Sequence, residues 1–141
     1  MAPVSRGKPM PTLLDTHAWV WWVTEDERLS RRAATVIRRS LADDSLFLSL
    51  ISVWEVAKKV EKGQLMLDRP VEQWLDQAVT PTGLGVWELT RPILVESCSL
   101  PQPFHGDSAD QIIVATARRH GAAIITKDDG IRNYPHVRSL W

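Results

Sequence analysis

The sequence predicts an α/β fold in which a central, mainly parallel sheet of about five short strands is flanked by helices. Two observations lead to this prediction. First, short and mostly apolar segments such as Leu46–Ser49 and Ala122–Thr126 are typical of strands that are buried on both faces. Second, segments with helical periodicity separate these strands, and a regular alternation of strands and helices favours parallel pairing.

The length and composition are those of a single globular domain. The chain has 141 residues, of which 44% are hydrophobic and 24% are charged, and a domain of this size can build a sizeable core. Residues 1–9 are mostly polar, contain proline and show no periodicity. We therefore expect a flexible N-terminal arm at residues 1–9 and one domain at residues 10–141.

Charge, cysteine content and hydropathy narrow the class of protein. The formal net charge is zero, so no overall basic field attracts nucleic acid, although a local basic rim can still guide phosphates. The single Cys98, which we expect in the core, excludes an internal disulfide bond and a cysteine metal cluster. No apolar run approaches the roughly 20 residues that span a bilayer, and Asp15 and His17 interrupt the first apolar segment, unlike a signal peptide. We therefore expect a cytoplasmic protein.

The first half of the chain is predicted to contain five elements. They are a strand at Thr12–Leu14, a helix at Ala18–Val23, a helix at Arg31–Leu41 capped by Ser30, a strand at Leu46–Ser49, and a helix from Ser52 to Lys62 that stops at Gly63. Asp15 directly follows the first strand. Glu55 has two interpretations, because it either completes a capping box with Ser52 or supplies a functional acid just beyond the second strand.

The second half is predicted to contain six elements. They are a short helix around Val71–Ala78, a strand at Val86–Leu89, a helix capped by Thr90 that runs to about Cys98, a helix after Asp107 that ends before Gly121, a strand at Ala122–Thr126 and a helical turn at Ile131–Tyr134. A short edge strand within His136–Leu140 is a further possibility. The regular order of these elements completes the α/β pattern.

The segment from His105 to Asp129 combines an acidic start, a helix, a strand and an acidic end. In open α/β sheets, ligands bind outside the carboxyl ends of the strands, where Asp128 is expected. Simpler structural roles stay open for these acids. Asp107 can be an N-cap with Asp110 at the third helical position, and Asp128, Asp129 and the following glycine can form a turn.

Four acids share one topological position, just past a strand or in the first turns of a helix: Asp15, Glu55, Asp110 and Asp128. Several carboxylates that converge repel one another, and a cation between them relieves that repulsion. Mg²⁺ and Mn²⁺ take oxygen ligands, keep several waters and leave room for phosphate oxygens. The pattern therefore favours metal-assisted hydrolysis of phosphodiester bonds.

Three segments in this order resemble the PIN-domain family, in its branch of VapC-type toxins. They are LLDTHAWVWW, SLISVWEVAKKVEKGQL and HGDSADQIIVATARRHGAAIITKDDGIRNYP, and the resemblance extends from Leu13 to Val137. It implies a PIN-like three-layer sandwich and a Mg²⁺- or Mn²⁺-dependent endoribonuclease that acts as the toxin of a toxin–antitoxin pair. It also implies a homodimer that is neutralised by a small DNA-binding antitoxin.

The resemblance assigns catalytic roles to four acids, of which the three aspartates are also metal ligands: Asp15, Glu55, Asp110 and Asp128. Five further residues are expected to support the site: Thr16, His17, Asp107, Thr126 and Asp129. The roles of Asp107 and Asp129 stay open, because each can support the metal ligands without touching the metal or can be purely structural. The sequence departs from the family at Ser108, where proline is frequent, and at Gln111, where arginine is common. Gln111 in place of arginine removes a possible contact with a phosphate or a carboxylate.

Rival classes fit the acids less well. A phosphatase of the haloacid-dehalogenase type needs a second aspartate two residues after the first, where this chain has His17, and a receiver domain has no use for Glu55 and Asp110. A PIN-like module that binds RNA or a partner without cutting is the alternative from a different class, and the intact acid set argues against it. Five tryptophans exceed what one small core needs, so some are expected to line a dimer contact or an antitoxin groove: Trp19, Trp21, Trp22, Trp54 and Trp74.

Overall fold

The computed structural model describes residues 9–80 and 83–141, and these contain a five-stranded sheet in the order β3-β2-β1-β4-β5. The strands are β1 (Thr12–Leu14), β2 (Leu46–Ser49), β3 (Gly85–Trp87), β4 (Ala123–Ile125) and β5 (Arg138–Leu140). All four pairings are parallel, which confirms the predicted fold class. The predicted arm at residues 1–9 lies almost entirely outside the described residues.

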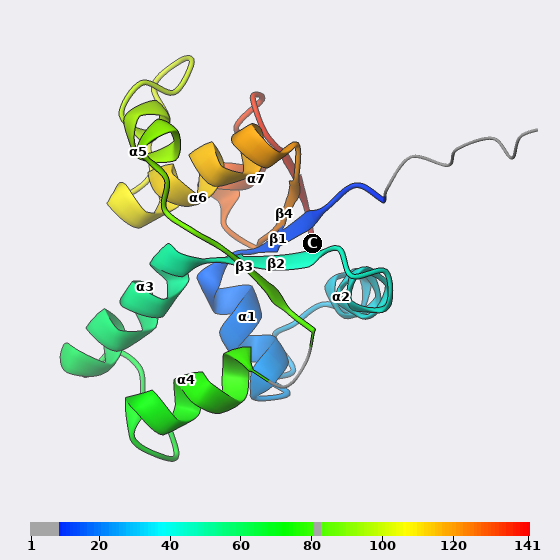
Figure 1. Cartoon of the computed structure of the whole chain (residues 1–141), viewed down its shortest axis with the longest axis vertical. Helices are drawn as coiled ribbons and strands as arrows, with labels where there is room; N and C mark the ends of the chain where they lie inside the picture. Colours follow the sequence, from blue (N-terminus) through cyan, green and yellow to red (C-terminus); the bar gives the residue numbers. More distant parts are fainter. Residues whose placement is uncertain (1–8, 81–82) are drawn as a thin grey trace, which may run out of the picture.

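Helices cover both faces of the sheet, which gives three layers (Figure 1). They are α1 (Thr16–Val23), α2 (Arg31–Ala42), α3 (Leu50–Glu61), α4 (Val71–Val79), α5 (Arg91–Ser97), α6 (Ser108–His120) and α7 (Asp129–Arg132). Helices α1 and α4 lie on one side of the sheet, and α6 and α7 lie on the other. This arrangement matches the predicted sandwich.

Neighbouring residues of the central strands point into different cores. Leu14 and Ile125 belong to the core formed with α1, α2, α3 and α4, whereas Leu13 and Ile124 belong to the core formed with α6 and α7. This alternation follows from the two-residue period of a strand. Because every one of these side chains is fully buried, the strands are apolar on both faces, as the sequence predicts.

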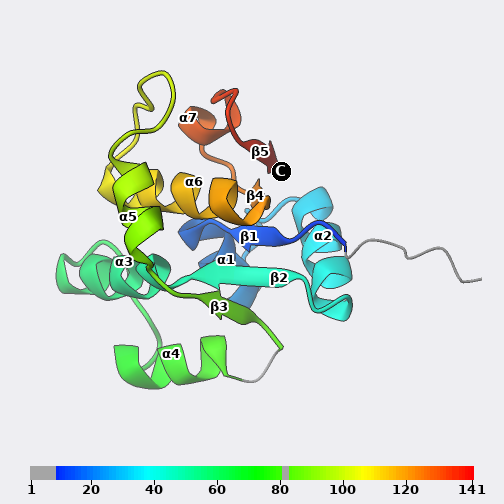
Figure 2. The ribbon, with the colours of Figure 1, turned by 45° about the horizontal axis from the view of Figure 1, so that its top comes forward.

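Parallel register aligns the carboxyl ends of the strands at one edge of the sheet. Leu14 at the end of β1 pairs with Leu48 in β2 and with Ile125 at the end of β4. The next residues therefore emerge side by side, and Figure 2 shows α1 and α3 leaving this end. Ser49 is both the last residue of β2 and the N-cap of α3, with its Oγ accepting a hydrogen bond from Ile51 N at 3.2 Å.

Most element boundaries agree with the sequence prediction, and the exceptions have local causes. The third strand lies at Gly85–Trp87, slightly earlier than predicted. The last helical turn begins at Asp129, because Asp128 caps it. Cys98 was expected in the core and is exposed, because it follows the last turn of α5, whose buried residues are Ile93 and Ser97. Within the described residues, the helices are all too short or too polar to cross a bilayer.

Candidate active site

Asp15 is fixed at the end of the central strand. It is the N-cap of α1, where its Oδ1 accepts a hydrogen bond from Thr16 N at 2.7 Å. Its Oδ2 accepts a hydrogen bond from the hydroxyl of Thr126 at 2.6 Å. Only 3% of the residue is exposed. The strand end and the helix start thus hold this carboxylate in one orientation.

Thr126 joins the first acid to the fourth. Its Oγ1 donates to Asp15 and accepts a hydrogen bond from Asp128 N at 3.0 Å. The carboxylate of Asp128 is half-buried, and its Oδ2 accepts from Ile131 N at 2.9 Å, which caps α7. A Cβ atom at Gly130 would lie 3.0 Å from this Oδ2, so a glycine here leaves room for the cap. Asp128 therefore caps a short helix, where a simple turn was the alternative expectation, and Thr126 links it to Asp15.

Glu55 lies in the second turn of α3 and is 8% exposed. The predicted capping box is wrong, because Ser49 caps this helix and Ser52 lies inside it. Instead, Thr16 Oγ1 donates to Glu55 Oε1 and lies 2.8 Å from Ser52 Oγ. Ser52 and Glu55 are three residues apart and so share one face of the helix. The sequence analysis missed Ser52 as a member of this site, although that spacing was the available signal.

Asp107 and Asp110 begin α6 and differ in burial. Asp107 is exposed and caps the helix, with its Oδ1 accepting from Asp110 N at 2.8 Å, so its predicted role as an N-cap is confirmed. Asp110 is half-buried, and it lies close enough to the other acids for their charges to raise its pKa. A Cβ atom at Gly106 would lie 2.9 Å from Asp110 Cβ. The backbone at Gly106 thus passes close to the side chain of Asp110.

The acids influence one another electrostatically. The pKa of Asp110 is raised from 3.8 to about 7, first by burial and then by the negative charges of the neighbouring acids Asp15, Asp107, Asp128 and Glu55. Burial also raises the pKa of Glu55, while the hydrogen bond from Thr16 and the charge of Lys59 lower it. Like charges that cannot separate favour the protonated form. The four predicted acids therefore share one region.

His17 connects α1 to the segment that carries Asp128. Its Nε2 accepts a hydrogen bond from Lys127 N at 3.0 Å, and its Nδ1 lies 3.5 Å from Asp15 Oδ2. An Nε2 that accepts is unprotonated, so the ring proton is on Nδ1 and faces the carboxylate. Burial lowers the pKa of His17 and favours this neutral form. The predicted supporting position of His17 agrees with these contacts.

The described residues contain no group of three or more acidic, histidine or cysteine side chains arranged to hold a metal ion directly. Asp129 is exposed at the start of α7 and is not in the hydrogen-bond network above. The donor set at the acid-rich end is all-oxygen, which suits hard divalent cations that keep several water ligands. Burial is the largest cause of the raised pKa of Asp110, and the charges of the neighbouring acids add to it; a cation would relieve that repulsion.

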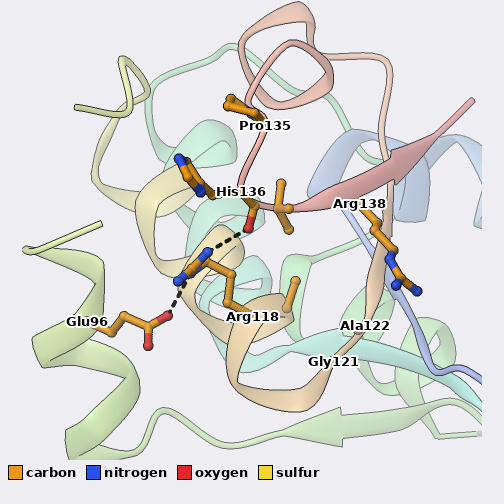
Figure 3. Close-up of a pocket in the computed structure, with 9 residues that line it drawn as sticks. Glu96, Arg118, Gly121, Ala122, Pro135, His136 and Arg138 are labelled. Carbon is orange, nitrogen blue, oxygen red and sulfur yellow. Dashed lines mark hydrogen bonds and ion pairs between the residues drawn. The ribbon is translucent and has the colours of Figure 1, made fainter. Parts of the chain in front are cut away.

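A second polar region lies at the opposite end of the sheet, before β4 and β5 begin. A pocket of about 520 Å³ there is lined by residues that include Glu96, Arg118, His136 and Arg138. Figure 3 shows Arg118 reaching between Glu96 and the backbone of His136. Arg118 Nε lies 3.2 Å from Glu96 Oε2, and its Nη1 donates to His136 O at 2.7 Å. These contacts tie α5 and α6 to the segment that enters β5.

The comparison with protein families identifies residues 12–137 as a PIN domain. The chain belongs to the PIN-domain family. It is 37% identical over 129 residues to Ribonuclease VapC22 of Mycobacterium tuberculosis, a match that covers 91% of this chain and 95% of that protein. The resemblance to the VapC-type branch is thus confirmed.

Chains of two solved structures have the same fold. A chain of the complex named VapBC2 from Rickettsia felis, bound to a DNA fragment of its promoter, has a TM-score of 0.67 at 14% identity, over 93% of this chain and 98% of that one. A chain of a toxin–antitoxin complex from Klebsiella pneumoniae has a TM-score of 0.60 at 22% identity, over 89% and 94%. At these identities the likeness establishes the PIN fold alone.

Proposed function

We propose that this PIN domain is a Mg²⁺- or Mn²⁺-dependent endoribonuclease that acts as the toxin of a toxin–antitoxin pair. The observation that carries the proposal is the grouping of Asp15, Glu55, Asp110 and Asp128 at the carboxyl end of the sheet, with the pKa of Asp110 raised to about 7. The similarity to a protein named a ribonuclease supports the choice of RNA as substrate.

Asp15, Asp110 and Asp128 are the residues that would hold the cation, partly through its water ligands, because the three carboxylates are not arranged to contact one ion together. When bound, a divalent cation supplies positive charge that stabilises the negative charge developing on phosphate and on the leaving oxygen. Thr126 holds Asp15 and the backbone of Asp128 together through one hydroxyl, so both carboxylates are already oriented before substrate binds. Such preorganisation removes the cost of ordering them during the reaction.

Glu55 is the residue that would accept a proton from the attacking water. Its Oε1 is engaged by the hydroxyl of Thr16, which leaves Oε2 for this role. Burial raises its pKa, and a raised pKa makes a carboxylate a better base near neutral pH. Ser52 shares the Thr16 hydroxyl and so helps to fix Glu55 without touching the substrate.

We further propose that the chain forms a homodimer, binds a small DNA-binding antitoxin and works in the cytoplasm. The toxin–antitoxin complexes among the structures with this fold support the partner. Leu94 and Val95 on α5 are 41% and 64% exposed, and exposed apolar side chains of this kind suit a contact between copies. Sedimentation velocity of the wild type and of Val95→Asp tests the dimer, which we expect the substitution to weaken.

Cleavage of a mixed RNA pool is the test of the proposed function. Purified protein with Mg²⁺ or Mn²⁺ is expected to produce fragments, and the same protein with a chelator is expected to produce none. Sequencing the 5′ ends of the fragments identifies the target RNA. The alternative, a PIN-like module that binds without cutting, predicts RNA binding with no fragments in either metal, and that result would replace the proposal.

A further inference from the structure

A pocket of about 270 Å³ lies directly beside the acid-rich end of the sheet, between α3 and the start of α6. Glu55 and Asp107 form part of its wall, and so does Trp54. Trp54 is 55% exposed, whereas Trp19 and Trp74 are buried in the core. An exposed tryptophan beside a polar pocket adds little to folding, because burial is what stabilises an apolar ring.

Trp54 and the pocket lysines follow the period of the helix. Trp54, Lys58 and Lys62 recur at four-residue steps along α3 and its C-cap, so they form one stripe. Lys59 lies beside this stripe, four residues after Glu55, and all three lysines line the pocket. The pocket therefore places one aromatic side chain and three lysines next to Glu55, and Lys58 Nζ also contacts Glu61 Oε1 at 2.7 Å on the exposed side of the helix.

We propose that this pocket binds one unpaired nucleotide of a single-stranded RNA, with its base stacked on Trp54 and its phosphates contacted by Lys58 and Lys62. The inference rests on the proposed ribonuclease function and assigns the residues that hold one substrate nucleotide beside the acids. Stacking on an aromatic side chain together with cationic contacts to phosphate is how proteins hold unpaired strands. A base within a duplex has both faces covered by its neighbours and cannot stack on Trp54.

The charges around Trp54 favour RNA over a second copy of the chain. Three lysines and two acids line the pocket. Lys58 is paired with Glu61 in an exposed ion pair, and because such pairs are weak a phosphate backbone can replace the carboxylate. A two-fold contact centred on this pocket would instead bring two sets of lysines together, and like charges oppose such a contact. Glu55 is shared by the pocket and the acid cluster, so a strand that leaves the pocket passes directly to the acids.

Equilibrium binding tests the stacking role of Trp54. The probe is a short, fluorescein-labelled single-stranded RNA of mixed sequence, and its binding is measured by anisotropy in the Asp15→Asn background, which prevents cleavage. Trp54→Ala is expected to raise the Kd by about 5- to 100-fold, and Trp54→Phe is expected to restore most of the affinity. Met66→Ala, which removes a side chain that is 92% exposed, is the matched control and should leave the Kd unchanged.

The salt dependence of the same measurement tests the lysines. For single strands, the slope of log K against log salt changes by about 0.7 for each phosphate contact. Lys58→Gln combined with Lys62→Gln should therefore make the slope shallower by about 1.4, whereas Trp54→Ala should leave it unchanged. Arg38→Gln combined with Arg39→Gln removes the same charge from α2, which lies away from α3 (Figure 1), and should change the slope little.

The possible outcomes separate this inference from the proposed function. If the wild type cleaves RNA and Trp54→Ala has the same KM, the function stands and the nucleotide pocket is overturned. If the wild type does not cleave but binding still depends on Trp54 and on the lysines, the pocket stands without the function. If Trp54→Ala converts a dimer to a monomer in sedimentation velocity while the Kd for RNA is unchanged, Trp54 belongs to an interface between copies and the inference is wrong.

Discussion

The two ends of the sheet are both polar, but they differ in how their charges are arranged. At the start of β4 and β5, Arg118 contacts Glu96 at 3.2 Å and the backbone oxygen of His136 at 2.7 Å, so the cation has an acidic partner (Figure 3). At the carboxyl end, Asp15, Glu55 and Asp110 lie together, and their shared charge contributes to the raised pKa of Asp110.

This difference separates a structural role from the functional role that we propose for the acid-rich end. A network in which opposite charges meet holds elements together and needs nothing further. A group of acids without an equal set of bases makes the metal-free fold less stable, and such unbalanced groups are found at functional sites more often than elsewhere. The hydrogen bonds from Thr16 and Thr126 hold the acids in place despite their repulsion.

Substitutions at the two ends of the sheet should therefore affect activity and stability separately. The largest effect that we expect is the loss of RNA cleavage at the acid-rich end. Asp15→Asn and Asp110→Asn should each lower RNA cleavage by roughly 100-fold or more, because a metal-assisted reaction gains several kcal/mol from the bound cation. Circular dichroism should show that both variants remain folded. Equal rates of cleavage by the wild type and both variants, measured on purified proteins, would remove these acids from the active site.

Arg118→Met is the matched substitution at the opposite end. It removes the contacts to Glu96 and to the His136 carbonyl, and it should lower the free energy of unfolding by about 1–3 kcal/mol. Its cleavage rate below the melting temperature should equal that of the wild type. If Arg118→Met stays stable and loses activity, the end of the sheet around Arg118 also takes part in the reaction.

Much of the fold could be predicted from the sequence because local signals agreed with one another. The apolar segments at Leu46–Ser49 and Ala122–Thr126 placed β2 and β4, and Gly121 has a φ of 64°, the left-handed conformation expected after α6. Exposure was harder to predict, because it depends on which face a neighbouring element covers. Cys98 was therefore misplaced, and the five tryptophans could not be divided between the core and the surface.

The acids of the site could be predicted from their positions after strands, but their contacts could not. Ser52 and Glu55 have the spacing of a capping box, and the sequence alone gave no reason to reject it. The structure rejects it because Ser49, the last residue of β2, already caps α3. The contacts of Glu55 with Thr16 join α3 to α1 across the sheet end, and a contact between residues so distant in the sequence has no local signal.

Added Mn²⁺ should stabilise the folded protein by binding at the acid-rich end of the sheet. We expect this effect to be smaller than the loss of activity. A ligand that binds only the folded state raises its stability by about 2.7 kcal/mol at a hundredfold excess over Kd. Mn²⁺ should thus raise the melting temperature of the wild type and of Arg118→Met by the same several degrees, and that of Asp110→Asn by clearly less. Equal shifts in all three proteins would show that the cation binds elsewhere.

The last expected effect is the pH dependence of stability in a chelator. The pKa of Asp110 is raised from 3.8 to about 7 in the folded protein, first by burial and then by the neighbouring acids. Below pH 3.8 the side chain is protonated in both the folded and the unfolded chain. As the pH rises toward 7, the unfolded chain ionises freely while the folded chain retains the proton, so the free energy of unfolding falls. Above pH 7 this loss is complete.

Asp110→Asn removes the titrating carboxyl group. Comparison with the wild type therefore isolates the contribution of this group to the free energy of unfolding. The difference in free energy of unfolding between Asp110→Asn and the wild type should therefore increase in favour of the variant from about pH 4 to pH 7 and then stay constant. Urea unfolding of both proteins at several pH values measures the difference, and groups that titrate in both proteins cancel. A difference that is constant across this range would mean that Asp110 keeps an ordinary pKa, and a variant that is less stable at every pH would mean that Asp110 mainly supports the start of α6.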